Sequence, residues 1–142
     1  MPQMRALRHL TISKVALVSV SWVVLWLVRL GLWLLPFGSL RRMLSRVKRR
    51  CLLSSARVPP ERVARAVEVA SHLVPRSTCL AKALAAHVLL RRSGYEGVLH
   101  VGVAHDAGGK FEAHAWLECE GKVIVGRGPR RFVPLPPIDM GD

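Results

Sequence analysis

The chain has 142 residues and a formal net charge of +13 at pH 7, because 22 lysines and arginines outnumber 9 acidic residues. This length fits one domain with an additional segment, and the charge should attract acidic partners such as an anionic membrane surface. The basic residues are not interleaved with aromatic side chains, so no nucleic acid is expected as a partner. Three cysteines without a CxxC spacing argue against a disulfide framework and a zinc ribbon, and favour a reducing compartment.

An apolar segment runs from Val15 to Phe37, and Arg29 is its only charged residue. Read through Arg29, it is about as long as a bilayer-spanning helix, which needs about 20 residues. Its tryptophans are typical of membrane interfaces. Three interpretations stay open: a helix that spans or lies on a membrane, a helix buried against the domain or a partner, and a cleaved signal peptide. If the segment spans, the basic residues after it place the rest of the chain in the cytoplasm.

A dense block of basic residues follows, from Arg41 to Arg50. Such a block is usually a solvated tether or a surface that meets anions, so residues 41–58 are predicted to form a basic helix and a linker. The chain therefore divides into a hydrophobic and basic N-terminal helical segment with a linker, residues 1–58, and a domain of residues 59–142.

Two helices are predicted at the start of this domain. The first begins at Pro60 and ends before Pro75, because proline suits the first turn of a helix and stops one that precedes it. The second begins after Ser77 or Thr78, both good N-cap residues, and ends near Gly94.

Beyond the second helix the apolar residues alternate with a period of two. This pattern predicts strands over residues 98–105, 111–118 and 122–126, joined by tight turns and followed by an irregular tail. The predicted fold class is therefore α+β, with helices packed on a small antiparallel sheet and preceded by a hydrophobic N-terminal helix.

Cys79 is predicted to lie on the first turn of the second helix. There the positive end of the helix dipole and the free backbone N–H groups stabilise a thiolate, which is the nucleophilic form of cysteine. The same N–H groups are placed to bind the oxyanion of a tetrahedral intermediate. A cysteine peptidase or an acyl transferase requires these features. The alternative is that Cys79 is a small apolar residue packed at a helix start.

His114 is the leading candidate among six histidines for the partner of this thiol. It is predicted in the middle of a strand, which would hold the imidazole rigidly; the alternative is a solvated sheet histidine. His100 and His105 would join it in a metal site only by accident of register, so neither a metal nor a cofactor is expected. The apolar residues of the opposite strand face, which should meet the core, are Phe111, Ala113, Ala115 and Leu117.

Three motifs occur together in the second part of the chain. A cysteine opens a helix and precedes Leu-x-x-x-Leu, a short Leu-x-x-Gly-Val strand follows, and a hairpin reads A-H-A-W-x-E-x-x-G. With this combination, from about Arg57 to Leu135, the chain resembles the B-type leader peptidases of lasso-peptide biosynthesis, which have a transglutaminase-like (papain-like) cysteine-peptidase core. The hydrophobic N-terminal segment is similar to that of their short stand-alone form.

The resemblance implies a function. This family removes the leader from a ribosomally made precursor peptide, and a separate lasso cyclase then closes the macrolactam. Carried over, Cys79 would be the nucleophile that forms a thioester acyl-enzyme, and His114 its base. No winged-helix-like recognition domain precedes the peptidase part, so leader recognition is expected to depend on a separate protein.

One departure from the family pattern concerns the group that orients the histidine. Transglutaminase-like triads end with an Asp on the next strand, where this chain has Gly126 and Arg127. Glu112 and Asp106 are candidate orienting acids, and a backbone carbonyl or a dyad without such a group are alternatives. The missing acid also motivates a second hypothesis, a non-catalytic membrane-associated adaptor built on the same scaffold.

Overall fold

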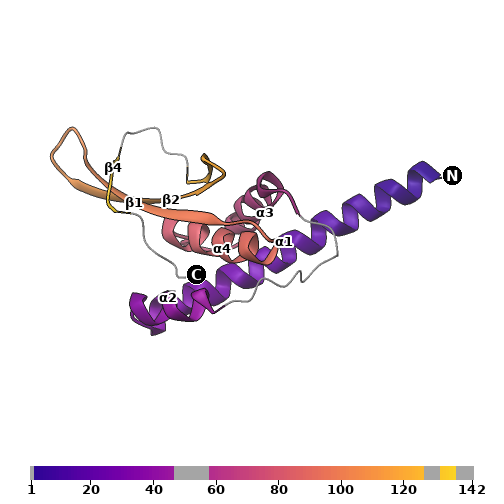
Figure 1. The fold of residues 1–142 in the computed structure, drawn as a ribbon, viewed down its shortest axis with the longest axis horizontal. Helices are drawn as coiled ribbons and strands as arrows, with labels where there is room; N and C mark the ends of the chain where they lie inside the picture. Colours follow the sequence, from indigo (N-terminus) through magenta and orange to yellow (C-terminus); the bar gives the residue numbers. More distant parts are fainter. Residues whose placement is uncertain (1, 47–57, 127–131, 137–142) are drawn as a thin grey trace.

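The computed structural model describes residues 2–46, 58–126 and 132–136. A long helix and a short one come first, two further helices follow, and the sheet completes the chain (Figure 1). The predicted α+β class, with a hydrophobic helix ahead of helices packed on a small sheet, is confirmed. The elements are α1 (Pro2–Leu34), α2 (Phe37–Ser45), α3 (Pro60–His72), α4 (Cys79–Arg92), β1 (Gly97–His105), β2 (Phe111–Cys119), β3 (Lys122–Val125) and β4 (Val133–Pro134).

The sheet is antiparallel, with the strand order β3-β2-β1-β4. β1, β2 and β3 are the three strands predicted from the alternating pattern of apolar residues. β4 corrects the prediction of a wholly irregular tail, because Val133 and Pro134 pair with β1 and the N–H of Leu135 donates to the carbonyl of Val101. A proline is tolerated there because β4 lies at the edge of the sheet.

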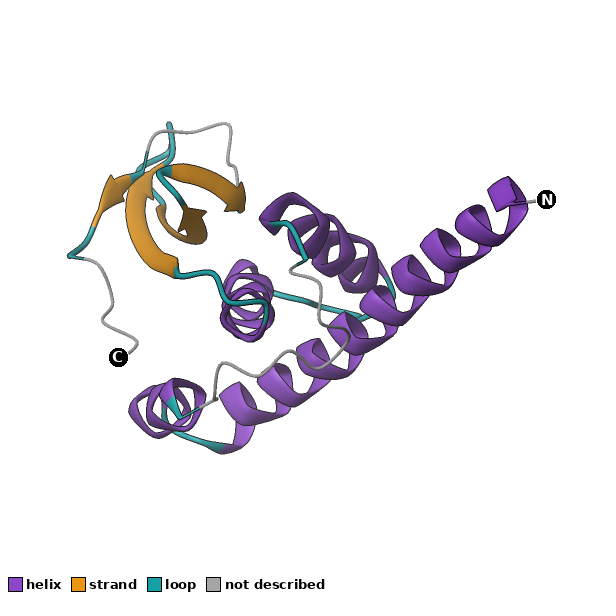
Figure 2. Cartoon of the chain, turned by 45° about the vertical axis from the view of Figure 1, so that its right-hand side comes forward, coloured by secondary structure: helices purple, strands orange, loops and turns teal. Residues whose placement is uncertain are grey.

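Helix α4 is the centre of the core. Together with α3 it lies between the sheet and α1, and it packs against all three (Figure 2). Its residues 83–90 are all buried. The small alanines of this helix let three neighbours pack against it from different directions, which explains the burial of every face.

Helix α1 packs its inner face on α3 and α4. Leu17, Ser21, Leu25 and Val28 are buried there, and the guanidinium of Arg29 donates a hydrogen bond to the carbonyl of Pro75. The core is thus continuous from α1 to the sheet, across the boundary predicted between residues 58 and 59. That division into two parts stays a prediction. Cys51 and most of the predicted basic linker lie outside the described residues.

The segment Lys14–Leu34 within α1 is long and apolar enough to cross a membrane, and 22% of its most hydrophobic window is buried in the protein. Buried core helices and signal sequences share this length and composition.

The apolar face of β2 meets the core only in its second half. Ala115 and Leu117 are buried, as is Cys119, whereas Phe111 and Ala113 are exposed. The prediction for the first half was wrong because the β1–β2 hairpin extends beyond the helices that cover the rest of the sheet (Figure 1).

His87 makes the stability of this core depend on pH. Burial, and then the charge of Arg91, lower its pKa below the ordinary 6.5, while a backbone hydrogen bond at Gly97 acts in the opposite direction. The unfolded chain takes up this proton at a higher pH than the folded chain. We therefore expect the free energy of unfolding to fall as the pH drops below 6.5. Thermal unfolding should show a flatter decline for His87→Leu; equal declines would contradict the prediction.

Candidate active site

Cys79 is the first residue of α4, as predicted. Thr78 is the N-cap residue, and its hydroxyl accepts a hydrogen bond of 3.2 Å from the backbone N–H of Ala81. The preceding loop is tied to α3 because the hydroxyl of Ser77 donates to the carbonyl of Ser71. Because Cys79 opens α4, its side chain lies at the positive end of the helix dipole. The residue is also partly exposed, so solvent can reach it.

His114 lies on β2 and is held by three neighbours. Its Nε2 donates to the backbone carbonyl of Gly126 over 2.5 Å. Its ring stacks on Phe132, with ring centroids 4.9 Å apart, and more distantly on Trp116, at 6.3 Å. With the Nε2 proton engaged by a carbonyl, Nδ1 is the ring nitrogen left to exchange a proton.

The structure brings Cys79 and His114 to one open pocket of about 580 Å³. The pocket lies between the exposed side of α3, the first turn of α4 and the end of β3, and its walls include Ile124 and Val125. Among the described residues no hydrogen bond joins the two side chains. Nucleophile–base contacts are often long until a substrate tightens the site, so this arrangement suits a Cys–His pair.

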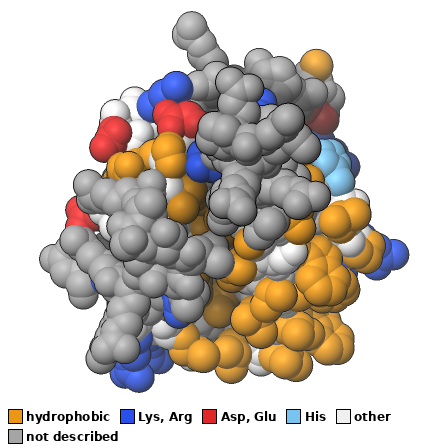
Figure 3. Space-filling view, turned by 90° about the vertical axis from the view of Figure 1, so that its right-hand side faces the viewer, with side chains coloured by type: hydrophobic (Ala, Val, Ile, Leu, Met, Phe, Trp, Pro, Cys, Tyr) orange, Lys and Arg blue, Asp and Glu red, His pale blue; other side chains and the backbone are white. Residues whose placement is uncertain are grey.

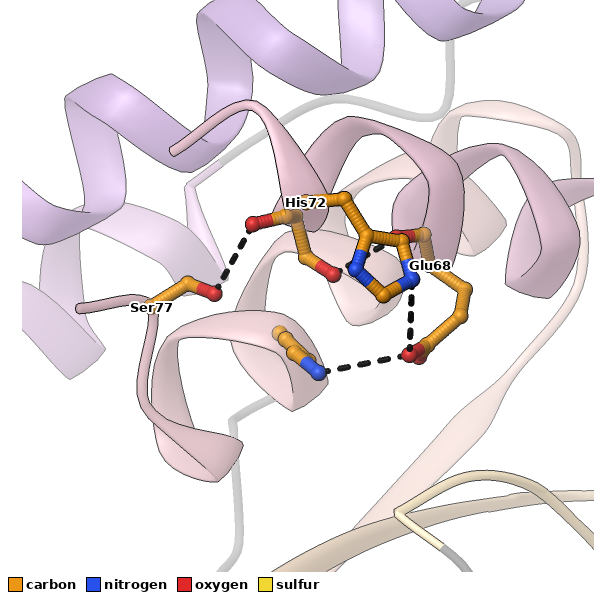
Figure 4. Close-up of polar contacts among 5 residues, drawn as sticks. Glu68, His72 and Ser77 are labelled. Atoms are coloured by element: carbon orange, nitrogen blue, oxygen red, sulfur yellow. Dashed lines mark hydrogen bonds and ion pairs between the residues drawn. The ribbon is translucent and has the colours of Figure 1, made fainter. Parts of the chain in front are cut away.

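Charged residues that the sequence did not point to also line the pocket (Figure 4). Glu68 lies 3.4 Å from the ammonium of Lys82 and 3.9 Å from His72. Lys82 follows Cys79 by three residues, a spacing that places both on one helix face. This spacing was the sequence signal that could have identified Lys82 as a neighbour of the site. Glu68 and His72 come from α3, and only the tertiary structure shows that this helix borders the site.

The two candidate orienting acids lie elsewhere. Asp106 is in the β1–β2 turn, where its Oδ1 accepts hydrogen bonds from the backbone N–H groups of Gly108 and Lys110. Glu112 is on β2, two residues before His114, and is not among the residues that line the pocket. An orienting role for either acid stays a prediction, and the hydrogen-bond partner seen for His114 is the Gly126 carbonyl.

The remaining cysteine and histidines of the sheet have other surroundings. Cys119 is buried, and burial raises the pKa of its thiol, which keeps it protonated. His100 contacts Glu118 at 3.3 Å and stacks on Trp116. Among residues 14–46, 58–126 and 132–136, no group of three or more His, Cys, Asp or Glu is placed to hold a metal ion.

These observations define an α+β protein in which a helix-opening cysteine and a strand histidine face a shared pocket. The family model of the Transglutaminase-like superfamily matches residues 22–136, and the chain belongs to this superfamily. Cysteine peptidases and transglutaminases are both members. The match begins within α1, so it includes only residues 22–34 of this helix. No curated protein and no solved structure matched the chain.

Phe132 is expected to position His114. The ring of Phe132 stacks on the imidazole, and a Phe132→Leu variant would keep an apolar side chain but lose the flat surface. We expect about a tenfold loss of kcat/KM in peptide cleavage, because the imidazole loses the flat surface that fixes its orientation. Leu135→Ala, which alters an exposed side chain three residues away, is the control. A kcat/KM equal to that of the wild type in the Phe132 variant would contradict the prediction.

Proposed function

We propose that the protein is a cysteine endopeptidase that removes the leader from a ribosomally made lasso-precursor peptide. The observation that carries the proposal is the meeting of Cys79 and His114 at one pocket, in a chain of the Transglutaminase-like superfamily. The leader-peptidase activity rests further on the motifs around these two residues.

In the proposed reaction the sulfur of Cys79 attacks the scissile carbonyl carbon. His114 takes the thiol proton on Nδ1 and later gives it to the leaving amine. The backbone N–H groups of Cys79 and Leu80 stabilise the oxyanion, because the first N–H groups of a helix have no carbonyl partner within it. The N–H of Ala81 is already bonded to the Thr78 hydroxyl. The thioester that remains is hydrolysed by water, with His114 accepting a proton from it. The Gly126 carbonyl keeps the imidazole in the required tautomer throughout.

The position of β3 supports a peptide as the substrate. β3 is the terminal strand of the sheet order, and Ile124, Val125 and Gly126 line the pocket. An extended peptide can add to such an edge by backbone hydrogen bonds, which bind without regard to side-chain identity. Recognition of the leader is then the task of a separate protein. A lasso cyclase would use the released core peptide, in the cytoplasm where the precursor is made.

The proposal is tested by incubating the purified chain with precursor peptide, with and without the leader-recognition protein, and following leader release by mass spectrometry. We expect rapid cleavage only with the recognition protein present. Equal cleavage in both mixtures would contradict the dependence on that partner. Failure to cleave in either mixture would contradict the peptidase assignment and favour an adaptor.

A further inference from the structure

The outward face of α1 is apolar although it faces away from the core. A helix that is apolar all round is ordinarily buried or in contact with lipid, yet α1 packs only its inner face on α3 and α4. The outward stripe is about 30 Å long at 1.5 Å per residue. Its large exposed side chains are Val15, Trp22, Val23, Leu27, Leu30, Trp33 and Leu34, and Trp33 is 82% exposed.

The charges around this stripe have one sign. No Asp or Glu precedes Glu61 in the sequence. Lys14 is exposed at the start of the apolar segment, and Arg41 and Arg42 are exposed on α2, just beyond its end. Hydrophobic side chains gather over one region of the molecular surface, with Lys and Arg at its margins (Figure 3). A hydrophobic patch with basic ends complements an anionic lipid surface and would repel a basic partner.

We propose that α1 and α2 dock the protein on an anionic bilayer leaflet, with α1 lying along the membrane rather than crossing it. The inner face of α1 is committed to the protein core through Leu25 and Val28, and Arg29 is bound to the carbonyl of Pro75. A spanning orientation would strip α3 and α4 from this face and expose their buried surface. Lying in the interface keeps the core intact and buries the outward stripe in lipid.

A groove next to the stripe is suited to the same contact. It has a volume of about 660 Å³ and is lined almost entirely by apolar side chains of α1, α2 and the end of α4, including Val23, Leu27 and Met43. Arg92 stands at the same groove. An apolar channel with an arginine is complementary to an acyl chain with an anionic headgroup.

This docking is independent of the proposed peptidase activity. α3 and α4 lie between α1 and the sheet (Figure 2), so the pocket of Cys79 opens on a different side of the helical layer from the outward stripe. The site would therefore remain accessible from water while the protein is bound to lipid.

Vesicle flotation tests the proposal with the full chain. Wild-type protein should float with vesicles of equal parts phosphatidylglycerol and phosphatidylcholine, and much less with phosphatidylcholine alone. A Leu27→Glu/Trp33→Glu variant should lose at least tenfold in binding, because both charges would have to enter lipid. Val98→Glu, at an exposed strand position 45% accessible to solvent, is the matched control and should bind as wild type. Unchanged flotation of the double variant, or no flotation of wild type, would overturn the proposal.

The depth of two tryptophans distinguishes lying from spanning. Variants that retain either Trp22 or Trp33 alone are bound to vesicles containing lipids brominated at different acyl positions, and fluorescence quenching is measured. Both side chains are on the outward stripe, so a lying helix places them at equal depth. A helix that crosses the bilayer would place Trp22, near the middle of the segment, deeper than Trp33. Deeper quenching of Trp22 would therefore overturn the in-plane arrangement.

Discussion

Cys79→Ala is expected to abolish peptide cleavage while leaving the fold intact. The change removes the atom proposed to form the thioester, so kcat should fall by at least about 10³-fold. Cys79 is only partly buried, and alanine is a good residue for the first turn of a helix, so thermal unfolding should change little. Cleavage of precursor followed by mass spectrometry measures the first effect and circular dichroism the second. A variant that still processes precursor would overturn the assignment of the nucleophile.

Cys119→Ala is the matched control for this experiment. It removes the other described thiol, which is buried against the core and protonated, and it should retain activity despite a modest loss of stability. The same pair of variants separates the enzyme from a non-catalytic adaptor. A catalytic Cys79 should react rapidly with iodoacetamide at neutral pH, and this rapid phase of alkylation should be lost in Cys79→Ala but kept in Cys119→Ala. Slow alkylation of Cys79 would favour the adaptor.

Gly126→Ala is expected to damage both stability and catalysis. Gly126 has φ +85°, which disfavours any side chain, and an added Cβ would come within 2.5 Å of the carbonyl oxygen of Ala115 and 2.9 Å of the Cα of Trp116. The backbone must therefore move, and with it the carbonyl that holds His114. We expect the free energy of unfolding to fall by about 2–4 kcal/mol and kcat/KM to fall more than tenfold.

Gly121→Ala isolates the part of this effect that comes from the backbone angle. Gly121 has φ +76°, close to that of Gly126, but a Cβ there would have no heavy atom within 4 Å. This variant should lose about 1 kcal/mol and keep its activity. Denaturant unfolding and peptide cleavage compare the two. Equal losses of stability and activity would show that contact at Gly126 is unimportant and that its carbonyl does not position the histidine.

Local chemistry accounts for the parts of the site that could be predicted. Ser77 and Thr78 are both good N-cap residues, which predicted Cys79 on the first turn of a helix, and alternation over residues 111–118 predicted a strand that carries His114. Glu68 and His72 could not be found in this way, because their place beside Cys79 depends on how α3 packs on α4. Phe132 could not be found from the sequence either, because its stacking on His114 depends on the pairing of β4 with β1.

The sequence by itself predicted the order of the helices and of β1, β2 and β3, and it placed Cys79 at a helix start and His114 on a strand, since each of these features depends on neighbours within one turn of a helix or one strand. Tertiary structure alone decided which group holds His114. The bulge between Leu117 and Glu118 and the left-handed backbone of Gly126 bring the Gly126 carbonyl to its ring. It also decided that one face of α1 belongs to the core and the other to the surface. An apolar helix carries no periodic signal of its own, so only its packing partners distinguish the two faces.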